Sequence, residues 1–310
     1  MHAIETVGLT KHYGRRNFFG RTASSGQPIR ALESLDLRVE PGEIFGFLGP
    51  NGAGKSTTIR LLLGFLHPTH GDARVLGLDV VRQSVQIRKR IGYLPGGIAL
   101  YDSLTGEQLL DYMARLSGRA PVRRAALCHR LELSQATLAR RVRDYSRGMR
   151  QKIGIVQALQ HDPELAILDE PTEGLDPLMQ RAFYSILDEL KSDARTIFFS
   201  SHVLSEVERV CDRVAIVRRG RLAAIERLPE LLARHRRNVE MRLDGAPPRL
   251  DDVPGVSGIA VSNGRLTCHL EGDVRPFLAA IAGAAIADLT IAPAHLEEAF
   301  LEYYADEEAS

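Results

Sequence analysis

Residues 43–66 constrain the fold of this chain more than any other stretch. Residues 44–48 form a short apolar run typical of a buried strand, and residues 56–66 have the apolar content of a packed helix. Between them, residues 49–56 read Gly-Pro-Asn-Gly-Ala-Gly-Lys-Ser, which fits the pattern G-x-x-x-x-G-K-[ST] at every fixed position. A strand, a glycine-rich turn and a helix in this order predict an α/β domain built around the turn.

The chemistry of this turn predicts a phosphate-binding loop. Glycines allow a backbone path that side chains would obstruct, so successive N–H groups can point at one set of phosphate oxygens. The N-terminus of the following helix adds partial positive charge at the same point. We expect Lys55 to reach the β- and γ-phosphates and the Ser56 hydroxyl to ligate Mg²⁺. The alternative is an accidental glycine-rich turn, but few accidental matches would also lie between a strand and a helix.

Composition limits the classes of partner. The 310 residues suffice for about two domains, and a formal net charge of +1 gives no reason to expect a nucleic-acid partner. The three cysteines are far apart and lack C-x-x-C spacing, so neither a zinc site nor a disulfide framework is expected. The most membrane-like stretch, residues 277–294, contains Asp288 and Pro293 and falls short of a spanning helix. We therefore expect that the chain itself does not cross a membrane.

Two adjacent carboxylates follow a second buried strand. Residues 165–168 are apolar, and Asp169 and Glu170 come directly after them. Because side chains alternate along a strand, the two carboxylates can take different roles. We expect Asp169 to hold Mg²⁺ through water and Glu170 to face the water that attacks the γ-phosphate. Two solvated acids are the alternative, which the upstream phosphate loop weakens.

The residues alone do not decide the roles of three further positions. Tyr13 follows a predicted strand at residues 4–9 and could stack on a nucleobase or pack in a sheet corner. Ser146 suits the N-cap of the next apolar helix, which is a purely structural role. His202 follows a predicted strand at residues 195–199 and could hydrogen-bond a γ-phosphate, although a lone histidine is more often structural.

Periodicity divides the rest of the chain. Residues 104–143 read as a helical insertion within the α/β domain, and residues 15–30 as a long loop or loose hairpin. After about Leu228 a small α+β unit is expected, with a hairpin at Asn263-Gly264 and a final helix at residues 295–304. The predicted domains are residues 1–227, with a helical subdomain at about 98–145, and residues 228–310.

The motifs together resemble the nucleotide-binding subunit of an ATP-binding cassette (ABC) transporter. Residues 49–57 match the Walker A motif, 145–151 the family signature, 165–170 the Walker B motif with its glutamate, and 174–176 the D-loop. The resemblance covers about residues 4–225, and the motifs occur in the family's order. It implies an α/β fold, namely a P-loop ABC cassette with a mixed-sheet core and a helical subdomain, followed by a C-terminal α+β accessory domain.

The resemblance also assigns roles to single residues. It implies ATP-binding roles for Tyr13, Gly49, Pro50, Asn51, Gly52, Ala53, Gly54, Lys55, Ser56 and Thr57. It implies that Glu170 and His202 are catalytic, that Ser56 and Asp169 hold the metal, and that Asp176 belongs to the D-loop. The signature residues expected to contact ATP bound by a second subunit are Ser146, Arg147, Gly148 and Met149.

The sequence departs from the family pattern at two places. Arg147 and Met149 stand where much of the family has Gly and Gln, a variant that resembles the branch pairing with separately encoded drug or polymer exporters. Gly96 and Gly97 stand where the family has Gln or Glu in its Q-loop, and neither can ligate Mg²⁺ with a side chain. Residues 293–301 are similar to the closing motif of the accessory domain in the same exporter branch.

The resemblance implies an ATPase that uses ATP and Mg²⁺ and dimerises head to tail, as a homodimer or heterodimer. It would lie on the cytoplasmic face of the cell membrane and power a separately encoded permease, in the direction of export. A soluble ABC ATPase acting on nucleic acid or ribosomes is an alternative, although such relatives usually carry a second cassette, a coiled coil or zinc-binding cysteines. A regulatory protein that binds ATP and turns it over poorly is another, given the missing Q-loop side chain.

Overall fold

The structure describes most of the chain, which divides into two compact units. The computed structural model describes residues 1–14, 29–234 and 237–292. Residues 15–28, which cover most of the predicted loop or hairpin, lie outside the described residues, as do the predicted closing motif and final helix after residue 292. Within the described ranges, no helix is long and apolar enough to cross a membrane. The chain divides into two compact units, Met1–Ile225 and Glu226–Ser310.

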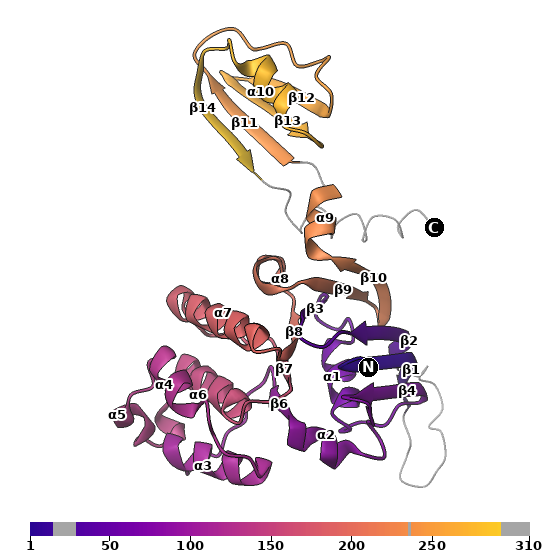
Figure 1. Cartoon of the computed structure of the whole chain (residues 1–310), viewed down its shortest axis with the longest axis vertical. Coiled ribbons are helices and arrows are strands. Elements are labelled where there is room, and N and C mark those ends of the chain that lie inside the picture. The colour runs from indigo at the N-terminus through magenta and orange to yellow at the C-terminus, as the bar shows by residue number, and fades with distance from the viewer. Residues whose placement is uncertain (15–28, 235–236, 293–310) are drawn as a thin grey trace. The chain divides into compact units, whose positions relative to one another are not determined.

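A six-stranded sheet with the order β10-β9-β3-β8-β7-β6 forms the centre of the first unit (Figure 1). Its strands are β3 (Ile44–Leu48), β6 (Ile91–Leu94), β7 (Leu165–Asp169), β8 (Thr196–Ser201), β9 (Arg213–Arg218) and β10 (Arg221–Arg227). The pairs from β9 through β3, β8 and β7 to β6 are parallel. Every residue of β3, β7 and β8 is buried, as expected for parallel strands covered on both faces.

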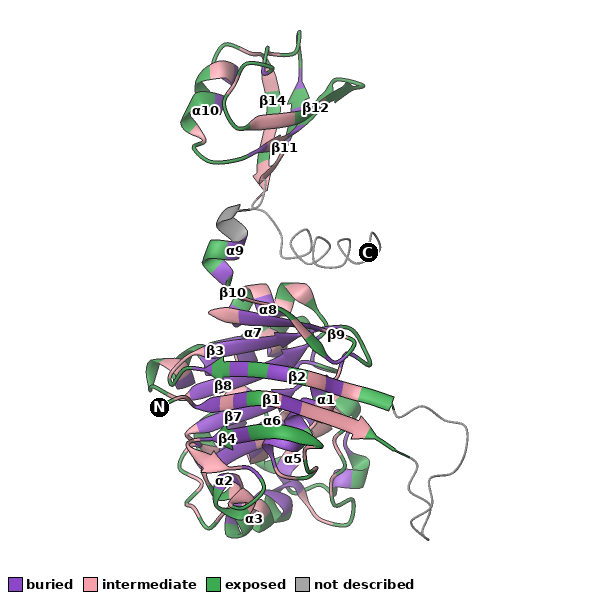
Figure 2. Cartoon of the chain, turned by 90° about the vertical axis from the view of Figure 1, so that its right-hand side faces the viewer, coloured by how far each residue is buried: buried purple, intermediate pink, exposed green. Residues whose placement is uncertain are grey.

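An antiparallel sheet with the order β2-β1-β4-β5 covers one side of this unit. Its strands are β1 (Ile4–Tyr13), β2 (Ile29–Val39), β4 (His70–Val75) and β5 (Leu78–Asp79). Buried and exposed residues alternate along β2, as Figure 2 shows, which is typical of a sheet with one face in the core. The first strand is longer than predicted, since its pairing with β2 continues to Tyr13 opposite Ile29.

The helices that bracket the six-stranded sheet position the site. Helix α1 (Lys55–Leu62) contacts β2 and β4 of the antiparallel sheet and also β7. Helices α7 (Pro177–Ser192) and α8 (Leu204–Val210) pack on β8, and α8 also packs on β3. Gly46 permits that last contact, because a Cβ there would lie 2.9 Å from Cγ1 of Val207.

The predicted helical insertion is present in the first unit. Its elements are α3 (Gly106–Ser117), α4 (Arg124–Arg130), α5 (Gln135–Leu138) and the 3₁₀ turn Val142–Asp144. Helix α2 (Ser84–Arg90) precedes the insertion, and α6 (Arg147–Leu159) follows it and leads back to the sheet. Side-chain caps set several starts: Thr105 and Gln108 form a capping box at α3, and the Ser146 side chain accepts from the backbone N–H of Met149 at α6. The predicted N-cap at Ser146 is therefore present.

The described residues of the second unit form an antiparallel sheet with the order β12-β13-β11-β14 and two short helices. Its elements are α9 (Leu228–Arg234), β11 (Arg237–Leu243), β12 (Val256–Ser262), β13 (Arg265–Leu270), α10 (Arg275–Ile281) and β14 (Ile286–Ala292). The predicted hairpin turn lies between β12 and β13, where Asn263 and Gly264 have φ of 48° and 71°. Phe277 and Ile281 of α10 are buried with the inward-facing residues of the sheet.

Candidate nucleotide site

The loop between β3 and α1 needs its glycines for close packing. A Cβ on Gly49 would lie 2.3 Å from the carbonyl oxygen of Val217, and one on Gly54 would lie 2.7 Å from that of Ala31. Gly52 and Gly54 also have φ of 81° and 107°, in the region that disfavours other residues. The loop is therefore fixed by its neighbours in a path that leaves the start of α1 open.

Lys55, the first residue of α1, is only 6% exposed. Its Nζ donates to the carbonyl oxygen of Gly49 at 2.6 Å and lies 3.3 Å from that of Pro50. The same Nζ lies 3.6 Å from Oε1 of Glu170. An ammonium group so little exposed needs such partners. A phosphate group entering the site would offer this cation oxygens in place of the carboxylate.

A cavity of about 240 Å³ opens beside this lysine. Its walls are formed by Ile29, Arg30, Ala31, Pro50, Asn51, Gly52, Gly54, Lys55, Ser56, Thr57 and Glu170. Seven of the ten residues predicted to bind ATP are among them. Tyr13, Gly49 and Ala53 are not part of the lining.

Ser56 and Asp169, the two residues predicted to hold the metal, are in contact. The Ser56 Oγ donates to Oδ2 of Asp169 at 3.1 Å, and Asp169 is 5% exposed. The other oxygen, Oδ1, accepts from the Ser200 Oγ at 2.8 Å. One carboxylate with hydroxyl groups suits Mg²⁺, which is usually held by one or two carboxylates together with substrate phosphates. No cluster of three or more His, Cys, Asp and Glu side chains suited to a metal occurs among the described residues.

Sequence reasoning missed Ser200. It is the last residue but one of the neighbouring parallel strand β8, where the register places it opposite Asp169. Its place near the carboxyl end of a predicted strand could have indicated a role, since polar residues at the carboxyl ends of adjacent parallel strands meet at one edge of the sheet. Local sequence did not reveal that β8 lies beside β7.

Glu170 and His202 come from different loops and are in contact. The Nδ1 of His202 lies 2.6 Å from Oε2 of Glu170. Glu170 has φ of 51°, a costly conformation for a residue other than glycine, and its N–H donates to the carbonyl oxygen of Ser200 at 3.0 Å. The glutamate is thus held between Lys55 on one side and the histidine on the other.

The signature residues lie against the D-loop and not in this cavity. A Cβ on Gly148 would lie 2.9 Å from the carbonyl oxygen of Gly174, and Arg147 forms an ion pair with Glu173. Asp176 caps α7, with its Oδ1 accepting from the N–H groups of Leu178 and Met179. None of the four signature residues lines the cavity beside Lys55.

The predicted base-stacking residue lies at the end of β1. Tyr13 is 37% exposed and pairs with Ile29, which does line the cavity. Its ring lies 5.5 Å below the Nζ of Lys11 and is not itself part of the lining. Tyr13 is therefore next to the cavity wall without forming part of it.

Comparisons with known proteins agree with this arrangement. The family model described as "ABC transporter" matches residues 32–173. An uncharacterized ABC transporter ATP-binding protein from Synechocystis is 35% identical over 309 residues, which cover 97% of this chain and 84% of that protein. The chain belongs to the ABC transporter ATP-binding proteins. It is an ABC ATPase subunit, so the predicted family, fold class and ATPase activity are confirmed.

Two further comparisons extend this result. The bacitracin transport ATP-binding protein BcrA from Bacillus licheniformis is 38% identical over 248 residues, which cover 77% of this chain and 74% of BcrA. A solved structure of the ATP-binding subunit of an ABC transporter superposes with a TM-score of 0.65 at 31% identity, covering 74% of this chain and 91% of that one. The similarity to BcrA includes part of the chain beyond the residues that the family model matches.

The Q-loop position of this cassette lies against Asp169, the carboxylate predicted to hold the metal. A Cβ on Gly96 would lie 3.4 Å from both the carbonyl oxygen and Oδ2 of Asp169. A Cβ on Gly97 would meet nothing within 4 Å. A longer side chain at position 96 would therefore lie next to Asp169, and the glycine supplies none.

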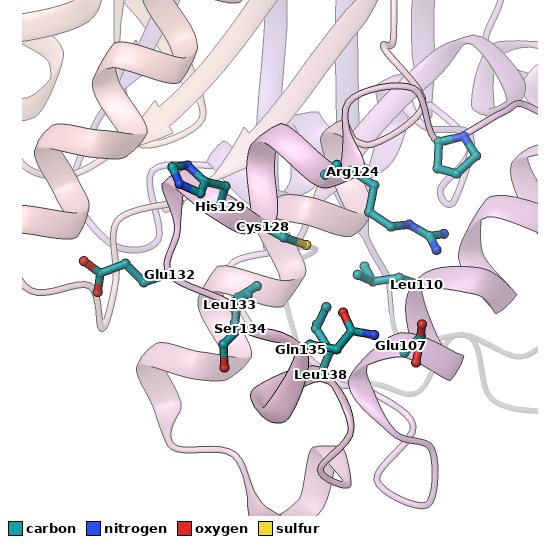
Figure 3. Close-up of a pocket in the computed structure, with 12 residues that line it drawn as sticks. Glu107, Leu110, Arg124, Cys128, His129, Glu132, Leu133, Ser134, Gln135 and Leu138 are labelled. Carbon is teal, nitrogen blue, oxygen red and sulfur yellow. The ribbon is translucent and has the colours of Figure 1, made fainter.

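Two other cavities lie away from the nucleotide loop. One, of about 470 Å³, lies between β6 and α3 and is lined by residues that include Phe65, Tyr93, Pro95, Ile98 and Leu116. The other, of about 750 Å³, lies within the helical subdomain between α3, α4 and α5 (Figure 3). Its lining includes Cys128, whose thiol pKa is raised by burial, but none of the residues predicted to bind ATP or metal.

Proposed function

We propose that this chain powers a separately encoded membrane permease through ATP-driven, head-to-tail closure of two ATPase subunits. One observation carries the proposal: the phosphate loop and Glu170 line one cavity, and Asp169 and His202 contact two of its lining residues, Ser56 and Glu170. The signature residues Ser146 to Met149 are not part of that lining. Each chain thus offers half of a closed site. A second subunit, identical or not, would bring its signature to the ATP held here.

The residues that line the cavity and those next to it would take different roles in hydrolysis. Loop N–H groups and Lys55 would hold the phosphates, and the exposed ring of Tyr13 would stack on the adenine. Mg²⁺ bound by Ser56 and Asp169 would neutralise charge on the β- and γ-phosphates. Glu170, released from Lys55 when phosphate takes its place, would accept the proton of the attacking water. His202 would fix the orientation of this carboxylate.

The 470 Å³ groove is the proposed contact for the permease. Phe65 and Leu116 line it together and are 54% and 60% exposed, so both could bury apolar surface against a partner. Leu94 and Pro95 in its wall directly precede Gly96, beside the metal carboxylate. An apolar helix of the permease seated here would touch the segment that leads to the ATP site.

The direction and location rest on the relatives. BcrA is named as a bacitracin transport protein, and the Arg147–Met149 variant of the signature resembles the exporter branch. We therefore assign this chain to export, with the cassette attached peripherally to the cytoplasmic face of the membrane. A permease chain in the same complex would supply the membrane spans.

Purification from membranes of the native host tests the proposal. A tagged protein is expected to bring with it a permease with many membrane spans. Phe65→Asp should reduce permease recovery, whereas Val122→Asp, another exposed apolar position outside the groove, should not. ATP binding by each purified variant serves as the folding check. Recovery with ribosomes or DNA instead of a permease would favour the non-transport alternative.

A further inference from the structure

Glu206 joins two loops of the site without belonging to any of the predicted motifs. It is the third residue of α8, and its two carboxylate oxygens accept hydrogen bonds from different segments. The Thr172 hydroxyl donates to Oε1 at 2.5 Å, and the Ser201 hydroxyl donates to Oε2 at 2.8 Å. Both hydroxyl residues are buried, at 4% and 1% exposure. Hydrogen bonds to a carboxylate are shorter and stronger than those between neutral groups.

The two segments are those that carry the proposed base and the histidine. Thr172 lies two residues after Glu170, on the loop that continues to the D-loop. Ser201 directly precedes His202, and its Oγ also accepts from the N–H of Val203 at 2.9 Å. One carboxylate therefore fixes the loop on each side of the 2.6 Å contact between Glu170 and His202.

An ordinary structural role would account for only part of this geometry. An acid in the first turn of a helix is stabilised by the helix dipole, and α8 has no side-chain cap at Val203. That role needs a negative charge but no buried hydroxyl partners. The pair of contacts to Thr172 and Ser201 instead requires two acceptors at a fixed separation.

We propose that Glu206 is a positioning residue for ATP hydrolysis, which holds the loops of Glu170 and His202 at their working distance. The proposal rests on the catalytic roles proposed above for those two residues. It also connects the segment that leads into the D-loop with the histidine, since a shift of Thr172 would be passed to Ser201 through the Glu206 side chain. Movement of the D-loop as two subunits close would thus alter the position of His202.

Steady-state ATP hydrolysis by the full-length chain tests this role. Glu206→Ala is expected to lower kcat by about tenfold or more, as loss of a charge-assisted hydrogen bond can do, with KM for ATP within about twofold of wild type. Glu206→Gln keeps one acceptor oxygen and should retain an intermediate kcat. Ser205→Ala, exposed on the same helix, is the matched control and should match wild type.

A double-mutant cycle separates positioning from helix stability. Thr172→Val should lower kcat by itself but cause little further loss in the Glu206→Ala background, because both changes break the same contact. A Glu206→Ala protein with unchanged kcat and a lower Tm would overturn the proposal in favour of the helix-dipole role. Independent effects of the two changes would also overturn it. Full activity of the Glu170→Gln variant would instead refute the proposed role of Glu170. The double-mutant cycle does not use that variant, so the two proposals can fail separately.

Discussion

Replacing Glu170 by Gln probes the centre of the proposed site with little change in shape. The substitution removes a carboxylate that lies 2.6 Å from Nδ1 of His202 and 3.6 Å from Nζ of Lys55. The side chain keeps its length, and the backbone keeps its φ of 51° through the bond to Ser200. Any change in rate should therefore reflect the lost charge and proton acceptor.

Two magnitudes follow from these contacts. A positioned general base contributes roughly 10²–10⁴-fold to rate, so kcat should fall at least about hundredfold, or about 3 kcal/mol in the barrier. The attraction across 3.6 Å between Lys55 and Glu170 is about 5 kcal/mol at an effective dielectric constant of about 20. Desolvation offsets most of that attraction. Because phosphate no longer competes with a carboxylate for Lys55, ATP affinity should stay constant or rise a few-fold, by about 1 kcal/mol.

The assay combines phosphate release with light scattering on the full-length protein. We expect Glu170→Gln to lose hydrolysis, keep ATP binding and accumulate as a dimer in ATP but not in ADP. Glu107→Gln, an exposed acid in the first turn of α3, is the matched control and should behave as wild type. Hydrolysis at the wild-type rate by Glu170→Gln would refute the assignment of the base. A dimer that forms equally in ADP would refute closure driven by ATP.

Three further changes address the metal site and acid stability. Gly96→Gln should raise apparent Mg²⁺ affinity by about threefold in ATPase titrations, because its side chain would extend toward Asp169. Ser200→Ala should raise the Mg²⁺ concentration for half-maximal activity by about tenfold, because Asp169 loses its 2.8 Å hydrogen bond. Hydrogen bonds from Arg195, with help from Arg123, hold the pKa of Asp162 below its usual range. The stabilisation from Asp162 is present above its unfolded pKa of about 4 and is lost as the pH falls through the folded pKa. In Asp162→Asn the free energy of unfolding should therefore fall less steeply as the pH is lowered.

Each of these expectations has an outcome that contradicts it. An unchanged Mg²⁺ titration in Gly96→Gln would mean that position 96 does not approach the metal in the working enzyme. A Ser200→Ala protein with wild-type Mg²⁺ dependence would remove Ser200 from the metal site. Urea unfolding at several pH values measures the third expectation. If the free energy of unfolding falls equally with acid in wild type and in Asp162→Asn, other carboxylates are responsible for acid unfolding.

Local sequence patterns determined the parts of the site that lie within one stretch of chain. The phosphate loop is readable because its glycines, its lysine and its flanking apolar runs are contiguous, and each has a local physical reason. The same holds for the Asn263-Gly264 hairpin and the Ser146 N-cap, where residue type sets the backbone conformation directly. Adjacent Asp169 and Glu170 could likewise be assigned different directions from strand alternation.

Tertiary structure decided which of these stretches meet. The strand order places β8 between β3 and β7, so Ser200 reaches Asp169 and His202 reaches Glu170 from a segment about thirty residues away. Gly96, two residues after the end of β6, lies so near the same carboxylate that a Cβ there would be 3.4 Å from Oδ2 of Asp169. Parallel neighbours are chosen by long-range packing and register, to which no short sequence pattern corresponds. The sequence therefore determined what the phosphate loop and the acidic pair could do, and the packing of the sheet determined the residues with which they do it.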